Sequence, residues 1–260
     1  MKFITKTYEI HSDKVKDNAI SVVLISDLHL AEYGDGNREL IREIRRIQPD
    51  LIVSSGDIVT AKPNHDTKVA EELLRTLAEE YPVYYAMGNH EERLKKREDL
   101  YGDMFTKYVN RLIEFGVKLL CNEHEVISIG NTAICIHGLQ LPLSYYQRMC
   151  RISLEQEVMT KFLGEADSEY YNILLAHHPR YADSYFDWGA DLTLCGHVHG
   201  GVMRLGNQAC ISPDLSIFPR YGYGRFDRGS QCVIVSGGLG EHSIPFRILN
   251  PKELIHLVIK

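Results

Sequence analysis

Five short apolar runs end in side chains that can bind a metal ion, and this repeated design limits the possible folds more than any other feature. In the run 51–59, LIVSSGDIV, the β-branched residues predict a buried strand, and Asp57 follows Gly56 at its carboxyl end. An aspartate there either caps the next turn or binds a metal. Because ligands bind at the carboxyl edge of open α/β sheets, the repetition favours metal. The other runs are 22–30 (VVLISDLHL), 83–90 (VYYAMGNH), 173–178 (ILLAHH) and 192–201 (LTLCGHVHGG).

The first half of the chain alternates strands with amphipathic helices. An edge strand is expected at 3–10, and one or two surface helices at 92–115, with a break near Gly102. This β-α-β-α-β-α order implies parallel strands and right-handed crossovers. The other expected strands are 22–26, 51–55 and 83–87, and the expected helices are 37–47 and 66–81, each ended by a proline.

The second half is richer in strands, and 118–120, 125–129 and 132–137 are expected to be antiparallel. One parallel and one antiparallel half predict an α/β fold of two sheets packed face to face, with helices on both outer faces and the strand tips along one edge. The candidate ligands extend from the first buried strand to the fifth, so residues 1–260 are expected to form a single domain. The remaining expected elements are strands at 173–176, 191–195, 202–205, 208–211, 231–236 and 254–259, a helix near 154–163 and a long loop at 212–229.

Composition excludes several classes of function. The net charge is −6, which argues against the basic surface that binds duplex nucleic acid. It still allows a small anionic substrate, because bound metal ions can dominate the local field. The six cysteines form no C-x-x-C pair, the first twenty residues contain no apolar core, and no apolar run approaches the ~20 residues of a membrane span. We expect a soluble, cytoplasmic protein without an integral membrane segment; the sequence indicates no oligomeric state.

The candidate ligands occur in short motifs. Asp27-x-His29 has the alternation of an extended strand, so both side chains can point the same way, and His197-x-His199 repeats this between glycines. D-x-H alone is weak evidence, whereas G-D, G-N-H-E and G-H-x-H in this order and context are strong. The full set is Asp27, His29, Asp57, Asn89, His90, His177, His197 and His199.

Across about residues 21–201, this series of motifs resembles the calcineurin-like metallophosphoesterase family. The later pattern, GHVHGGVMRL and then ISPDLSIFPRYGYGRF, is also similar to a bacterial branch of predicted phosphodiesterases and UDP-diacylglucosamine pyrophosphatase-like proteins. The resemblance implies a four-layer αββα sandwich of two mixed sheets, and it selects His177 over His178 as a ligand. The implied ligands are Asp27, His29 and His199 for a first metal, Asn89, His177 and His197 for a second, and Asp57 as the bridge.

The chemistry implied by the resemblance is hydrolysis at phosphorus. The imidazole and oxygen ligands suit two divalent or transition metal ions, Mn, Fe, Zn or Co, with Mn favoured. A metal-bridging hydroxide would attack phosphorus, and His90 would act as general acid or stabilise the charge at the leaving oxygen. Glu91 either orients His90 or is a solvated acid in the first turn of a helix.

The leading prediction is therefore a phosphoesterase with a dinuclear metal site and a small phosphodiester or pyrophosphate as substrate. The alternatives are a phosphomonoesterase, including a protein phosphatase, and a non-catalytic scaffold, which the complete ligand set disfavours. Arg220 and Arg225 either bind substrate phosphate or stabilise a surface loop. Tyr145 and Tyr146 either stack on a base or sugar, or pack the segment 139–167.

Overall fold

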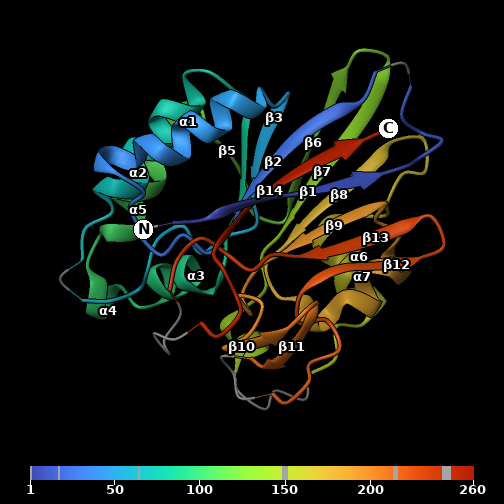
Figure 1. Ribbon diagram of the computed structural model, residues 1–260. Coiled ribbons are helices and arrows are strands. Elements are labelled where there is room, and N and C mark those ends of the chain that lie inside the picture. The colour runs from blue at the N-terminus through green and yellow to red at the C-terminus, as the bar shows by residue number, and fades with distance from the viewer. Residues whose placement is uncertain (1, 17, 64, 148–151, 213–215, 242–246) are drawn as a thin grey trace.

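The computed structural model describes the chain except residues 1, 17, 64, 148–151, 213–215 and 242–246. Two six-stranded sheets pack face to face around a core of apolar side chains. Two further apolar clusters lie on the outer faces, where helices cover each sheet (Figure 1). The predicted fold, a four-layer αββα sandwich of two mixed sheets, is confirmed.

The first sheet contains the parallel strands expected from the first half of the chain. Its strand order is β1-β14-β2-β3-β4-β5, and all neighbours are parallel except β14 and β2. The expected edge strand is confirmed as β1, which pairs with the last strand of the chain. The bounds are β1 (Ile4–Ile10), β2 (Ile20–Ile25), β3 (Leu51–Ser54), β4 (Val83–Ala86), β5 (Lys118–Leu120) and β14 (Glu253–Ile259).

Three helices cover the outer face of this sheet, α1 (Arg38–Ile47), α2 (Lys68–Ala78) and α5 (Met104–Glu114) (Figure 1). Helix α1 buries Leu40, Ile41 and Ile44, which share one face at helical spacing. The surface segment 92–115 contains α3 (Asn89–Lys96), α4 (Glu98–Tyr101) and α5, and the expected break at Gly102 lies between the last two.

The second sheet is not the antiparallel half that the sequence predicted. Its order is β12-β13-β9-β8-β7-β6, and the four central strands are parallel, because α6 (Gln156–Leu163) and α7 (Ala182–Trp188) form crossovers that return the chain to the same end. Antiparallel pairs occur only at the two edges described, β6–β7 and β12–β13. The bounds are β6 (Glu123–Ile129), β7 (Thr132–Leu139), β8 (Tyr171–Ala176), β9 (Leu192–Cys195), β12 (Gly224–Arg228) and β13 (Gln231–Val235).

Two more expectations were wrong in detail. The strand 118–120 pairs with β4 in the first sheet and is parallel to it, because α5 forms the crossover. The expected loop 212–229 contains β12. A small hairpin of β10 (Met203–Leu205) and β11 (Gln208–Ile211) lies beside the two sheets (Figure 1). The short 3-10 turns are η1 (Asp35–Asn37), η2 (Leu143–Tyr146) and η3 (Pro179–Tyr181).

Within the described part of the chain, no helix combines the length and the apolar character that a bilayer span requires. The single-domain organisation and the cytoplasmic location stay predictions.

Candidate metal centre

The loops that follow β2 and β3 continue the pairing of their strands. The backbone N–H of Asp27 donates to the carbonyl of Gly56, and that of His29 donates to the carbonyl of Asp57, both at 3.0 Å. The next such bond joins Leu30 to Ile58. This backbone ladder holds the first three candidate ligands at the carboxyl edge of the first sheet.

The backbone at these ligands is not extended, so the geometry expected for Asp27 and His29 was wrong. Left-handed backbone in a non-glycine residue costs roughly 1–3 kcal/mol and is concentrated at functional sites, where the surrounding packing maintains it. Here it turns the chain sharply after the strand, which strict alternation does not anticipate. Five candidates share this conformation: Asp27 (φ 50°), His29 (φ 48°), Asp57 (φ 55°), His197 (φ 69°) and His199 (φ 49°).

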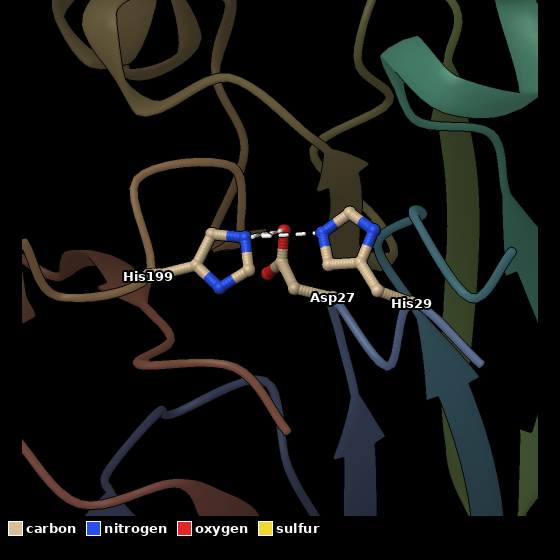
Figure 2. A group of neighbouring side chains, drawn as sticks. All are labelled: Asp27, His29 and His199. Atoms are coloured by element: carbon tan, nitrogen blue, oxygen red, sulfur yellow. Dashed lines mark hydrogen bonds and ion pairs between the residues drawn. The ribbon is translucent and has the colours of Figure 1, made fainter. Parts of the chain in front are cut away.

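The structure brings most of the predicted ligands into overlapping groups of His and Asp, with ligand atoms within 4.8 Å of one another in each group. The first group is Asp27, His29 and His199, and Figure 2 shows the two imidazole rings on either side of the carboxylate. The rings are nearly parallel, 8° apart, and their Nε2 atoms lie 3.1 Å from each other. The other groups are Asp57, His177 and His197, and His29, Asp57 and His90.

The two carboxylate oxygens of Asp57 face different partners. Its Oδ1 accepts the backbone N–H of His90 at 2.8 Å and so caps α3. Its Oδ2 lies 3.1 Å from Nε2 of His177 and 3.8 Å from Nε2 of His29. Burial opposes ionisation of Asp57, but the charges of His177 and His90 hold its pKa well below the ordinary value. One oxygen of Asp57 therefore caps the distant helix α3 and not the next turn, and the other oxygen faces two histidines.

Two buried atoms near Asp57 fit a cation. His177 donates from Nδ1–H to the carbonyl of Ser55 at 2.8 Å, which leaves Nε2 directed at the site. That Nε2 is close to Asp57 but not aligned for a hydrogen bond, and Oδ1 of Asn89 is also buried with no hydrogen-bond partner in the part of the chain that the structure describes. Burial lowers the pKa of His177, but Asp57 and Asp27 raise it to about 9. A metal ion would therefore take the place of a proton on His177.

Two motif glycines are required by close approach to the carboxylates. A Cβ at Gly88 would lie 2.2 Å from Oδ1 of Asp57, and one at Gly196 would lie 2.3 Å from Oδ2 of Asp27. No side chain fits at these distances. The glycines of G-N-H-E and G-H-x-H therefore make room for the aspartates of the neighbouring motifs.

The ring of His90 has a defined tautomer. Its Nδ1 accepts the backbone N–H of Ala61 at 2.8 Å, so the proton of the neutral ring is on Nε2. Burial lowers the pKa of His90, which favours this neutral form. The ring packs edge-to-face against His29, with centroids 4.8 Å apart. His90 therefore presents an N–H donor next to the metal-binding groups.

Neither interpretation of Glu91 was correct. Its carboxylate is fully buried, and no hydrogen bond between it and the ring of His90 occurs among the described residues. It instead joins the Asp57 loop to the start of α3. It accepts hydrogen bonds from the backbone N–H of Asp57 (3.0 Å), Ile58 (3.0 Å), Val59 (3.3 Å) and Gly88 (3.0 Å), and from the hydroxyl of Tyr85 (2.6 Å).

Sequence reasoning missed two residues that hold the loop of His199. Asn250 donates from Nδ2 to the carbonyls of His199 at 2.7 Å and Gly201 at 2.6 Å. A guanidinium nitrogen of Arg247 lies 3.1 Å from Nδ1 of His199. Both residues follow His199 by about fifty positions, and no motif spacing connects them to it.

The two arginines considered for substrate binding are engaged elsewhere. The guanidinium of Arg220 pairs with Asp183 at 2.8 Å, and both side chains are exposed. Arg225 pairs with Asp227, also at 2.8 Å, on β12. These contacts favour the alternative of a stabilising surface arginine for both residues, although Arg225 lies on a strand and not in a loop.

The family model described as calcineurin-like phosphoesterase matches residues 20–201 of this chain. An uncharacterized metallophosphoesterase of Campylobacter jejuni is 26% identical over 261 residues, which cover 98% of this chain and 63% of that protein. A putative metallophosphoesterase of Caenorhabditis elegans is 25% identical, and the match covers 52% of its length. The uncharacterized metallophosphoesterase YkuE of Bacillus subtilis is 26% identical, and the match covers 94% of this chain and 80% of that protein.

Solved structures resemble the fold at low sequence identity. Phosphopantetheinyl hydrolase from Mycobacterium tuberculosis is 14% identical, with a TM-score of 0.51 and coverage of 85% of this chain and 90% of that one. The sulfate thiohydrolase SoxB from Thermus thermophilus is 11% identical, with a TM-score of 0.50 and coverage of 95% and 58%. These likenesses show the fold alone. Since the two names denote different reactions, the substrate has to be argued from the site.

Proposed function

This chain belongs to the calcineurin-like phosphoesterase family, and we propose that it hydrolyses a phosphodiester or pyrophosphate bond in a small phosphorylated substrate, using two bound metal ions. One observation carries the proposal. His/Asp groups from both sheets meet at one place, where Nε2 of His177 and Oδ1 of Asn89 are buried and form no hydrogen bond with any described residue. Buried acceptors of this kind need a cation or a donor.

The residues divide between two ions as the resemblance implies. Asp27, His29 and His199 would hold one ion. Asn89, His177 and His197 would hold the other. Asp57 Oδ2, which faces a histidine of each group, would lie between them. Bound there, the ions would act as Lewis acids and lower the pKa of a water that attacks phosphorus. The mixed nitrogen and oxygen ligands suit Mn, Fe, Zn or Co better than Ca, and Mn is the ion that we propose.

His90 would assist the departing group. Because Ala61 occupies Nδ1, the Nε2–H of the neutral ring is the group available to an oxygen of the substrate. It would donate a hydrogen bond to the leaving oxygen and stabilise the negative charge that develops there as the ester bond breaks, while keeping its own proton. Removing one such donor from an active site typically lowers the rate 10²–10³-fold.

The most specific part of the proposal is the class of substrate. Similarity of the patterns at residues 196–205 and 211–226 to the bacterial phosphodiesterase and UDP-diacylglucosamine pyrophosphatase-like branch supports a diester or pyrophosphate over a monoester. The net charge of −6 favours a small substrate over duplex nucleic acid.

The test is a panel of metals and substrates with the purified protein. With Mn²⁺, we expect cleavage of bis-p-nitrophenyl phosphate to exceed cleavage of p-nitrophenyl phosphate. His90→Gln is expected to lower kcat about 10²-fold with unchanged Mn content. A preference for the monoester would select the phosphomonoesterase alternative. Absence of turnover with Mn, Fe, Zn and Co on diesters, monoesters and nucleotide sugars would remove the enzymatic proposal.

A further inference from the structure

Tyr146, which belongs to none of the metal-binding motifs, lies against the histidines of the second group. Its ring centroid is 6.0 Å from that of His177 and 5.3 Å from that of His197. The ring belongs to η2, which lies in the sequence after the site residues of the first sheet and before those of the second. The same turn also contacts α3. Tyr146 thus borders the place where Asn89, His177 and His197 meet.

The ring of Tyr146 is used in packing. It is nearly parallel to the ring of His178, with an interplanar angle of 12° and centroids 5.4 Å apart. His178 in turn lies 4.2 Å from the ring of His197, measured between centroids. Because His178 covers one face of Tyr146 and His197 meets it at 65°, the ring packs the site in preference to stacking on a base or sugar.

The segment that carries Tyr146 is held in place. The hydroxyl of Tyr181 donates to the backbone carbonyl of Tyr145 at 2.8 Å, and the rings of these two residues meet edge-to-face. Tyr181 also packs edge-to-face against His178. The position of Tyr146 is therefore tied to the strand end that carries His177.

The hydroxyl of Tyr146 is left over from this packing. Among the described residues, no group forms a hydrogen bond with it. The side chain is half-buried at the site. Burial and then the charges of Asp57, Glu91 and Glu92 raise the pKa of Tyr146.

We propose that the Tyr146 hydroxyl donates a hydrogen bond to a phosphoryl oxygen of the substrate bound next to His177 and His197. The inference rests on the proposed function and names a further substrate-binding residue for it. A phenol is a donor at neutral pH, and hydrogen bonds from a hydroxyl to an anionic oxygen are short and strong. A ring fixed by His178 would hold this donor in place before the substrate arrives.

The experiment removes the hydroxyl and keeps the ring. Tyr146→Phe is compared with wild type and with Tyr145→Phe, the same change one residue earlier, using the Mn²⁺-loaded full chain. We expect Tyr146→Phe to bind inorganic phosphate about tenfold more weakly in calorimetry, and to lower kcat/KM for bis-p-nitrophenyl phosphate by a similar factor. Tyr145→Phe should match wild type in both, and the Mn content of all three should be equal.

The outcomes separate this inference from the proposed function. Equal phosphate affinity and equal kcat/KM in wild type and Tyr146→Phe would overturn the inference. So would a loss of Mn in Tyr146→Phe, because the residue would then act only through the histidines. If wild type binds phosphate but cleaves no ester, the proposed function fails. The phosphate affinities of the variants would still decide whether Tyr146 is a binding residue.

Discussion

The two halves of the metal centre are held in different ways. In the first-sheet half, a backbone ladder joins the loops of Asp27 and Asp57, and the buried carboxylate of Glu91 fixes the second loop to α3. In the second-sheet half, the loop of His199 depends on side chains from far along the chain, Asn250 and Arg247. The comparison shows that the first half is built within about sixty-five residues, whereas the second requires the C-terminal region.

Hydrogen bonds also join the two halves directly. Oδ1 of Asp27 accepts the backbone N–H of His197 at 2.8 Å. Nδ1–H of His177 donates to the carbonyl of Ser55 at 2.8 Å. Each half therefore orients a candidate ligand of the other. Variants that act in one half, in the other, or between them can measure how far the halves are independent.

The largest effect is expected where the halves share a ligand. Asp57→Asn removes a negative charge from the oxygen that faces both His29 and His177, and it should lower the rate of diester cleavage by more than ~10³-fold. Mn binding, measured by calorimetry and elemental analysis, should fall from two ions to one or none. Asp99→Asn, an exposed acid on α4, is the control. Wild-type rates in Asp57→Asn would contradict the shared role.

A smaller effect is expected from breaking the first half alone. Glu91→Gln keeps the shape of the side chain, but its NH₂ group faces donors, so buried N–H groups of the Asp57 loop lose their acceptor. We expect Mn affinity to fall about 10–100-fold, as for other residues that orient metal ligands. The free energy of unfolding should fall by about 1–3 kcal/mol.

The control for Glu91→Gln is Glu92→Gln. Glu92 is also buried, but its side chain bonds Gln140 and not the Asp57 loop. Equal Mn affinity in the two variants would show that Glu91 does not position the site.

Breaking the second half should have a milder result. Asn250→Ala removes the two hydrogen bonds to the carbonyls of His199 and Gly201. We expect one Mn ion to bind about tenfold more weakly, while the other keeps its affinity. Two-site calorimetry distinguishes the ions. Weakening of both ions to the same degree would show that the halves form one cooperative unit.

The smallest effect on metal binding is expected outside both halves, at His137 on β7, where we expect a change in stability only. Its Nε2–H donates to Oδ1 of Asn172 at 3.1 Å, and burial lowers its pKa to about 4. Because the pKa is 6.5 in the unfolded chain, the folded state binds fewer protons. Stability is therefore full above pH 6.5 and is lost as the pH falls toward 4, by at most about 3 kcal/mol.

His137→Gln should flatten this dependence in urea unfolding between pH 7 and pH 4. A residual slope is expected because burial also lowers the pKa of His29 to about 4. Mn affinity at pH 7 should stay at the wild-type value. An unchanged pH slope would show that His137 is not one of the groups that titrate on unfolding.

The predictions from sequence succeeded where a short run of residues was enough to determine the local structure. Apolar runs predicted β2, β3 and β4, and their polar ends predicted where side chains would gather. The predictions failed where the structure depends on contacts between segments that are far apart in the sequence. The parallel pairing of β7, β8 and β9 depends on crossovers through helices, which strand patterns alone do not reveal. The alternation of residues in a strand also did not predict the left-handed turn that places His29.

By itself, the sequence determined the αββα layers and the set of Asp, His and Asn side chains at the strand ends, because periodicity and residue type are local properties. Only the tertiary structure decided which atoms of those side chains face the site. The ring of His90 is oriented by a backbone N–H twenty-nine residues earlier, at Ala61. The carboxylate of Glu91 accepts hydrogen bonds from the loop of Asp57, more than thirty residues earlier in the chain. Hydrogen-bond partners such as these are set by which strands lie next to each other in the sheet, here β3 and β4, and local spacing in the sequence does not contain that information.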